Sequence, residues 1–590
     1  MTNIFRFLPL IAILLLPNML RAQVSEDITS DELREHVEFL ASDELQGRKP
    51  GTEGGDAAAE YIRDRLREAG LELLDNDGMQ SFPIVTGISA ADDCALTVDG
   101  VVAELGKNFT PVSFTGEAAV EAGVVFAGYG FDFELDSSAW HDYEGLDVTG
   151  KWVLVLRGSP DSESGDFDPF MSLRKKAMVA HDHGAAGVLF TSGPGFDKDD
   201  ALVEMGYQQQ ERAMDLPVLS ISRTLADDLL GETTIESLEK ELNTQRAPLR
   251  TACSGSVSSS IRMERHSIEG HNVIGLIKGE GPHADEYIVL GAHYDHLGMG
   301  GPGSGSRRPD TSAVHNGADD NASGVAAIIE VAERISASGK VPGRSILVVA
   351  FTAEEMGLLG AKYFVDNPPV DLQSLKLMCN LDMVGRMPEG EKSLSISGTG
   401  TAEGLSALVE DVVAKEGFTA KLSPEGYGPS DHAAFYSRDV PVLFFFTGIN
   451  QYYHTPEDDA DKLNYVGEKL LADLVHGIVE AVAQRPDALT YVESGPKSRP
   501  ATSKRFKVTL GIMPDVSSSN EKGLRADAVM EGRPAFRAGM KKGDIIVSME
   551  GKSVNGVYEY MDRLSEFKSG QRITVEVLRD GEKVLLIVEL

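Results

Sequence analysis

The spacing of apolar residues predicts two N-terminal helices and, further along the chain, alternating strands and helices. Residues 31–41 and 55–69 carry apolar side chains at the helical repeat, with Gly70 placed to end the second helix; residues 47–52 between them predict a loop. After Asn272 we expect strands at 287–290, 345–351, 375–381 and 440–446, and helices at 324–338, 357–365 and 402–416. This alternation predicts an α/β fold with a mixed, largely parallel sheet flanked by helices.

A different pattern separates these two regions. Residues 123–126, 152–156 and 187–191 are short apolar runs typical of strands, and residues 171–183 have helical spacing. We therefore expect a self-contained, β-rich domain over residues 112–250. It would be inserted into the α/β domain, whose two parts are residues 24–111 and 251–487.

A break in charge marks a further domain near the C-terminus. Residues 496–505 hold four basic residues, no acidic ones, two prolines and three Ser or Thr, a composition typical of a linker. Residues 506–590 hold 13 basic and 13 acidic residues. We predict a linker over residues 488–505, few contacts across it, and a separate domain over residues 506–590.

The first 23 residues predict an export signal. Arg6 is the only charged side chain before an apolar run at residues 7–16, and Ala22 offers a small residue for cleavage before Gln23. Ten helical residues span about 15 Å, half of a bilayer core of about 30 Å. The run therefore favours a signal over an anchor, and we expect a secreted or periplasmic protein with no membrane span in the mature chain.

Composition limits the functions that are open to this chain. Its 590 residues are 42% hydrophobic and 25% charged, an ordinary globular mixture. The net charge of −37 repels phosphate backbones and anionic lipids, which disfavours nucleic-acid and membrane-surface binding. Three widely spaced cysteines build neither a disulfide framework nor a Cys-type zinc ribbon. A metal ion would have to be held by histidines and carboxylates.

Metal-binding residue types stand at the end of each predicted strand in the α/β region. The segments are residues 291–296, 316–324, 352–355, 380–382 and 451–456. Taken singly, Glu354 and Glu355 could be a solvated helix start, and Asp319 and Asp320 a helix N-cap. Taken together they favour a shared site, because ligands of open α/β sheets bind beyond the carboxyl ends of the strands.

The run from residue 291 to 456 resembles the family of co-catalytic dizinc aminopeptidases and related glutamate carboxypeptidase-like exopeptidases, the M28 clan. The resemblance covers about residues 31–485 without the insert. It implies a ligand set for two zinc ions: His293 and Asp382 for one, Glu355 and His454 for the other, and Asp320 as the bridge. It also implies three roles in the reaction: Glu354 as the general base, Asp295 orienting His293, and Tyr453 stabilising the oxyanion.

These residue types suit that chemistry. Imidazole and carboxylate bind zinc at about 2.0–2.2 Å, and two metal ions about 3.5–4 Å apart act as a pair in aminopeptidases. A bridging hydroxide would attack the scissile carbonyl, and Glu354 would move the proton. Four other candidates are weaker. We expect His296 to be structural or to support a ligand, His315 to be at the surface, Arg386 to pair with an acid, and residues 430–432 to line the cleft.

The two flanking regions resemble known modules. The insert resembles a protease-associated (PA) domain at residues 123–130, 151–155 and 183–188, and its alternative role is a passive β insert. The C-terminal region resembles a bacterial-type PDZ domain: residues 510–512 match the carboxylate-binding loop, and Pro534, Gly539 and Gly543 fit the turns of the core pattern. That resemblance implies a C-terminal peptide as ligand, with a purely structural cap as the alternative.

The sequence therefore predicts an exported zinc exopeptidase that removes N-terminal residues from peptides. Carboxylates dominate the motif segments and favour a cationic substrate end, whereas Arg386 is the only arginine among them; an arginine of the insert such as Arg174 could still enter the cleft. The alternatives are a carboxypeptidase or dipeptidase of the same clan, a glutaminyl-cyclase-like enzyme, which the full ligand set disfavours, and a non-catalytic peptide-binding protein.

Overall fold

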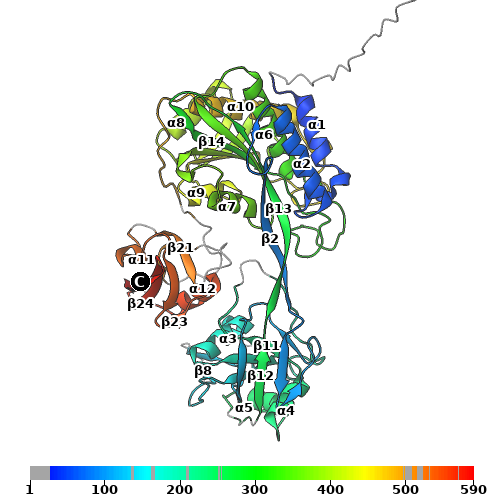
Figure 1. The fold of residues 1–590 in the computed structure, drawn as a ribbon, viewed down its shortest axis with the longest axis vertical. Helices are drawn as coiled ribbons and strands as arrows, with labels where there is room; N and C mark the ends of the chain where they lie inside the picture. The colour runs from blue at the N-terminus through cyan, green and yellow to red at the C-terminus, as the bar shows by residue number, and fades with distance from the viewer. Residues whose placement is uncertain are drawn as a thin grey trace, which may run out of the picture.

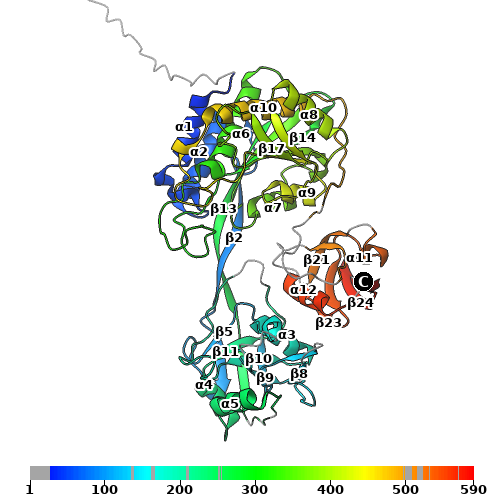
Figure 2. The same ribbon diagram turned by 180° about the vertical axis from the view of Figure 1, so that it is seen from behind.

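The computed structural model describes residues 27–134, 139–160, 167–207, 212–249, 251, 253, 255–495, 497, 508–514, 523–529, 532–568 and 570–590. The predicted signal at residues 1–23 and most of residues 496–507 lie outside this part. Figures 1 and 2 show three bodies: an α/β body, an inserted body joined to it by a long two-stranded ribbon, and a C-terminal body beside both. In the described part, no helix is both long and apolar enough to cross a membrane.

A nine-stranded mixed sheet forms the centre of the α/β body. Its strands are β1 (Glu72–Leu73), β2 (Met79–Ala90), β13 (Met263–Ile277), β14 (His283–His293), β15 (Arg344–Phe351), β16 (Leu375–Leu381), β17 (Ser393–Ser397), β18 (Thr419–Ser423) and β19 (Val442–Phe446). The four central strands, in the order β15-β14-β16-β19, are parallel, so their carboxyl ends lie at one edge. Each predicted strand of this region is present, and the predicted fold class is confirmed.

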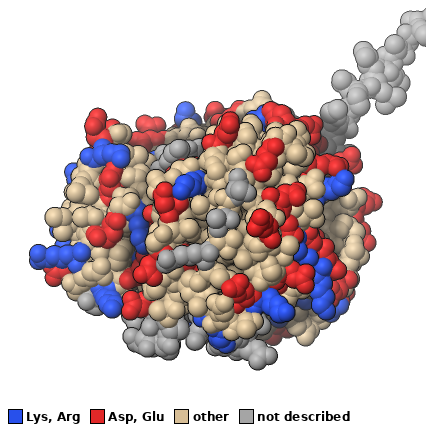
Figure 3. Space-filling view, turned by 90° about the horizontal axis from the view of Figure 1, so that it is seen from below, with Lys and Arg blue, Asp and Glu red and all other residues tan. Residues whose placement is uncertain are grey.

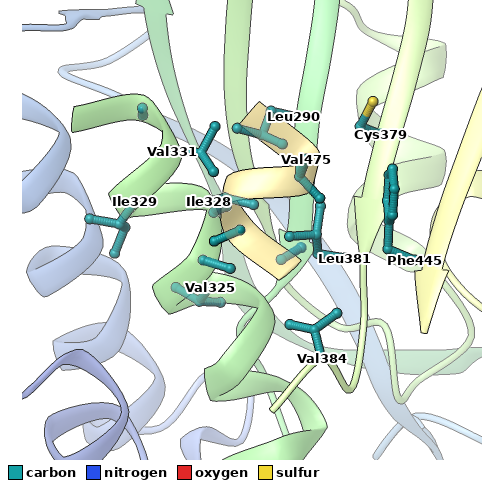
Figure 4. Close-up of a cluster of buried hydrophobic side chains, with 14 of the residues drawn as sticks. Leu290, Val325, Ile328, Ile329, Val331, Cys379, Leu381, Val384, Phe445 and Val475 are labelled. Carbon is teal, nitrogen blue, oxygen red and sulfur yellow. The ribbon is translucent and has the colours of Figure 1, made fainter. Parts of the chain in front are cut away.

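Helices cover both faces of this sheet. One face carries α1 (Ser30–Leu40), α2 (Glu53–Glu68), α6 (Gly324–Ala337), α8 (Leu405–Lys415) and α10 (Tyr465–Ala483), and the other carries α7 (Leu359–Asp366) and α9 (His432–Ser437). Strand β15 is buried along its whole length, as expected for a parallel strand between two helical layers. Figure 4 shows Val325, Ile328 and Val331 of α6 packing toward Leu290 and Leu381 of the sheet. This core fixes the strand ends that carry the predicted metal ligands.

The ribbon consists of β2 and β13, which pair antiparallel from Met79↔Val273 to Met263↔Ala90. The last residues of β13 also pair antiparallel with β15, from Val273↔Ala350 to Ile277↔Ile346. The ribbon therefore leaves the sheet at the edge where β14, β15 and β16 end (Figure 1). That edge faces the inserted body.

The inserted body is built on an eight-stranded sheet, in the order β4-β3-β12-β6-β9-β10-β11-β5. The strands are β3 (Ala95–Val98), β4 (Val101–Val102), β5 (Phe109–Pro111), β6 (Ala119–Phe126), β9 (Trp152–Leu156), β10 (Gly187–Thr191), β11 (Val218–Ile221) and β12 (Ser256–Ser260), with helices α3 (Leu173–Asp182), α4 (Arg223–Leu230) and α5 (Ile235–Gln245). Because β12 pairs with both β3 and β6, this sheet extends beyond the predicted limits of 112 and 250 on both sides.

The C-terminal body is a small β domain. Its strands are β20 (Ile512–Pro514), β21 (Leu524–Val529), β22 (Ile545–Met549), β23 (Lys552–Ser553), β24 (Arg572–Arg579) and β25 (Glu582–Glu589), and its helices are α11 (Pro534–Arg537) and α12 (Val557–Ser565). Its own core includes Leu510, Ile546 and Val575. Ion pairs between α12 and α3 of the inserted body connect the C-terminal body to the rest of the chain. Figure 3 shows acidic side chains over the whole face seen from below, with basic ones among them.

Candidate metal centre

The strand ends bring the predicted ligands together. His293 is the last residue of β14, and Asp382 directly follows β16. Asp320 lies in the irregular turn Ala318–Ser323 that leads into α6. The Nε2 atom of His293 is 3.3 Å from Oδ1 of Asp320 and 3.4 Å from Oδ1 of Asp382. These three side chains form one group whose ligand atoms could hold a metal ion.

A second group shares Asp320. The Nε2 atom of His454 is 3.2 Å from Oδ2 of Asp320 and 3.2 Å from Oε2 of Glu355. His296, Asp320 and Glu355 also satisfy the geometry of a metal-holding group. The two oxygens of Asp320 therefore face different groups, as a bridging carboxylate requires.

The donor atoms of these groups fit metal ions. Within the described part, Nε2 of His293 and Oδ1 of Asp382 are buried without a hydrogen-bond partner. An unpaired buried polar atom costs about 1–3 kcal/mol, so such atoms call for an explanation. A mixed set of imidazoles and carboxylates is typical of zinc ligands, and cations placed between them would satisfy every one of these atoms.

Two further histidines of the motif region are buried, one as expected and one against expectation. His296 is buried, and its Nδ1 atom is 2.9 Å from Oε1 of Glu355, so it directly contacts a predicted ligand. His315 is also fully buried, which contradicts the expected surface position. The hydroxyl of Ser306 is 2.8 Å from its Nε2 atom, because the glycine-rich loop folds back over the imidazole. The composition of this glycine-rich loop does not by itself predict that the loop covers His315.

Asp295 holds the turn that carries the two glutamates. Its carboxylate accepts the backbone N–H of Glu354 at 2.9 Å and that of Glu355 at 3.4 Å. The ring Nδ1 of His293 is 3.2 Å from the carbonyl oxygen of Asp295 and 3.7 Å from its carboxylate. Asp295 thus contacts His293 through its main chain while its side chain fixes the Glu354–Glu355 turn.

The environment of Glu354 disfavours its negative charge. Burial raises the pKa of its carboxyl well above the ordinary value; His293 opposes this, and Glu355 and Asp431 add to it. Burial also raises the pKa of Asp431 to about 8, and neither of its carboxylate oxygens has a hydrogen-bond partner in the described part. Such groups retain their charge only with compensating positive charge nearby.

Arg48 supplies positive charge that the sequence did not point to. It ends the short helix Asp43–Arg48, which overlaps the start of the predicted loop, and is fully buried. Its guanidinium donates to four carbonyl oxygens, those of Tyr294, Leu40, Asn316 and Gly317, at 2.5–2.9 Å. Burial lowers its pKa to about 10, while Asp295, Asp320 and other carboxylates act in the opposite direction. Arg48 ties the segment after His293 to the one before Asp320, and no sequence signal marks that role.

The remaining candidates take different places. The ring of Tyr453 stacks on that of His454, with the ring centroids 3.8 Å apart. Arg386 lies over the ring of Tyr452, 4.9 Å from its centroid. Arg174, considered above as a cleft arginine, forms a buried ion pair with Glu559 of the C-terminal body instead. Arg174 is therefore committed away from the metal-binding groups.

The three parts of the chain match known family models. Residues 272–479 match peptidase family M28, residues 115–229 the PA domain and residues 508–590 the PDZ domain. The segment that matches family M28 lies between the two other matched segments in sequence order, so the predicted family resemblance is confirmed.

Proteins similar to this chain include bacterial aminopeptidases. Aminopeptidase YwaD of Bacillus subtilis (strain 168) is 25% identical over 401 residues, which cover 65% of this chain and 73% of that protein. The probable lipoprotein aminopeptidase LpqL of Mycobacterium tuberculosis is 24% identical over 442 residues, covering 73% and 75%. A solved aminopeptidase from Aneurinibacillus sp. strain AM-1 is 20% identical, covering 80% and 97%, with a TM-score of 0.43. A structural likeness this loose supports no conclusion about activity.

Proposed function

We propose that this protein is an exported zinc aminopeptidase with two metal ions per chain. The observation that carries the proposal is the pair of histidine–carboxylate groups that share Asp320 beside Glu354. His293 and Asp382 would hold one zinc ion, Glu355 and His454 the other, and Asp320 both. The relatives named aminopeptidases support this choice within the M28 family. The apolar run at residues 7–16 supports export.

When bound, zinc ions supply Lewis-acid polarisation of the scissile carbonyl and make water a stronger acid. Glu354 takes a proton from the attacking water at its carboxylate and gives it to the leaving amine. Asp295 holds Glu354 in place through the backbone amide at 2.9 Å. The phenol of Tyr453, beside His454, donates to the developing oxyanion.

The charges around the site favour a substrate with a free N-terminus. A carboxypeptidase needs a cation, typically arginine, for the terminal carboxylate. Arg174 is paired with Glu559, and Arg308 is paired with Glu457. Asp319, Asp431 and Asp458 add buried carboxyl groups near the metal-binding groups. An α-ammonium group therefore finds partners here more readily than a carboxylate does.

The test compares kcat/KM for one peptide in three forms: free, N-acetylated and C-amidated, with products identified by mass. We expect acetylation to abolish cleavage and amidation to change it less than about threefold, because the amide leaves the N-terminal contacts intact. Loss on amidation with tolerance of acetylation would contradict the proposal in favour of a carboxypeptidase. If the metal-loaded protein cleaved none of the three forms, the result would favour a non-catalytic peptide-binding protein.

A further inference from the structure

The PDZ domain is not an isolated appendage in this structure. Its helix α12 lies beside helix α3 of the PA domain in both views (Figures 1 and 2). Arg174 at the start of α3 pairs with Glu559 of α12, and Arg563 of α12 binds Asp182 at the end of α3 with two hydrogen bonds, of 2.5 and 2.8 Å. Two ion pairs therefore connect the two helices, and each helix contributes one arginine and one carboxylate.

These ion pairs are buried rather than superficial. The side chains of Arg174 and Glu559 are 8% and 2% exposed, and those of Arg563 and Asp182 are 1% and 12% exposed. Surface ion pairs contribute little, whereas a charge left without its partner in a buried position is strongly destabilising. Separating α3 from α12 would take the partner away from each of these charges. The free-energy cost of separation is therefore small only if both charges of a pair become solvated at the same time.

Further contacts between the PA and PDZ domains surround these two ion pairs. Lys175 of α3 pairs with Glu566 at 3.1 Å, just beyond α12. The guanidinium of Arg212 donates to the carbonyl of Gly523 in the PDZ domain. On α12, Glu559 and Arg563 are four residues apart on the docking face, while Tyr560 and Leu564 point into the core of the PDZ domain. The docking face is thus distinct from the face that holds the PDZ domain together.

The PDZ domain also contacts the peptidase domain. The Nζ atom of Lys542 is 3.2 Å from Oδ2 of Asp439, which lies two residues after the end of α9. Helix α9 packs on the same face of the sheet as α7, the helix that follows the Glu354–Glu355 turn. The PDZ domain therefore reaches both the PA domain and the α7–α9 face of the peptidase domain.

We propose that the PDZ domain is an internal strut whose partner is the α3 face of the PA domain of the same chain. The ribbon of β2 and β13 alone would let the PA domain swing relative to the metal-binding edge, since its outer half is a two-stranded element. The α3–α12 interface joins the PA and PDZ domains into one body, and the half-exposed contact of Lys542 with Asp439 adds a second point of attachment to the peptidase domain beside the ribbon. This inference does not depend on the proposed peptidase activity.

Small-angle X-ray scattering on the full chain tests the strut. The variants are Glu559→Arg, Arg174→Glu, the double reversal, and the matched control Arg572→Glu, whose side chain is 74% exposed and pairs only within the PDZ domain. We expect either single reversal to increase the radius of gyration and maximum dimension, because it places like charges against each other. The double reversal should restore both quantities toward wild type, and the control should leave them unchanged.

Hydrogen exchange of α3 and α12 gives an independent readout. Single reversals should raise exchange in both helices while strands β24 and β25 keep their protection, which shows that the PDZ domain remains folded. If Glu559→Arg unfolds the PDZ domain, Arg174→Glu, located in the other domain, still reports on the interface. Identical scattering and exchange in wild type and all variants would overturn the proposal, as would a concentration-dependent dimer formed through this interface.

Discussion

Glu354 and Glu355 are neighbours in the chain, yet their carboxylates meet different partners. Glu355 contacts His454 and His296, whereas the described ion pairs of the site do not include Glu354. Asp295 holds both backbone amides, so the two side chains diverge from one fixed turn. This divergence would allow Glu355 to bind metal and Glu354 to move protons, as proposed above.

Exchanging each glutamate for glutamine separates these roles. Glu354→Gln should lower kcat by about 10²–10⁴-fold, because an amide cannot accept the proton, and should leave the metal content unchanged. Glu355→Gln should instead reduce the metal content, measured by atomic emission on dialysed protein. Turnover of Glu354→Gln within tenfold of wild type would show that another group is the base.

Arg48 gives a prediction about stability at the same scale. Arg48→Gln leaves buried carbonyl oxygens without donors and should lower the free energy of unfolding by at least about 2 kcal/mol. Arg67→Gln is the control, because Arg67 lies in the neighbouring helix α2 and forms only exposed ion pairs; it should change the free energy by less than about 0.5 kcal/mol. Urea unfolding of the metal-free protein measures both values, and equal values would refute the assigned role of Arg48.

At the scale of elements, the base of the ribbon supports the glutamate turn. Asn272 of β13 is fully buried; its side-chain oxygen accepts the N–H of Thr352, and its amide donates to the carbonyl of Gly360 at 2.9 Å. The same amide donates to Gln80 of β2. Asn272 therefore clamps both ends of the segment that carries Glu354 and Glu355.

Removal of this clamp should affect turnover more than substrate binding. We expect Asn272→Ala to lower kcat by about 10–100-fold with KM changed less than threefold, because small displacements of a positioned group are costly. Asn367→Ala, which removes an exposed side chain at the end of α7, is the control and should keep both constants. A pure rise in KM in Asn272→Ala would indicate a substrate-binding role instead.

The same elements show how far sequence patterns reach. Strands such as β16 were predictable because they are mostly apolar and bounded by polar residues. The ribbon strand β13 was not predicted, because its first half is largely exposed and only its second half is buried in the sheet, so no single period runs along it. Helix α10 is not among the predicted helices, although its apolar residues follow a helical repeat.

At the scale of the whole molecule, local composition predicted the number and order of the domains better than their contacts. The charge break and the proline-containing segment indicated a separate C-terminal domain, and residues 508–590 match a PDZ domain. Composition could not predict that Glu559 meets Arg174 across 385 positions of chain. Likewise, the family resemblance implied ligand roles for Asp320 and Glu355, whereas the burial of Arg48 and His315 depends on how distant segments fold over them.

The central claim is that two metal ions share Asp320 and are required for peptide cleavage. The most direct measurement titrates zinc into the chelator-stripped full chain by calorimetry while hydrolysis of an aminoacyl amide is followed in parallel. We predict two equivalents bound per chain, activity that rises with their occupancy, and less than half of that zinc bound by Asp320→Asn. Binding of one equivalent or none, or full activity of the stripped chain, would contradict the account.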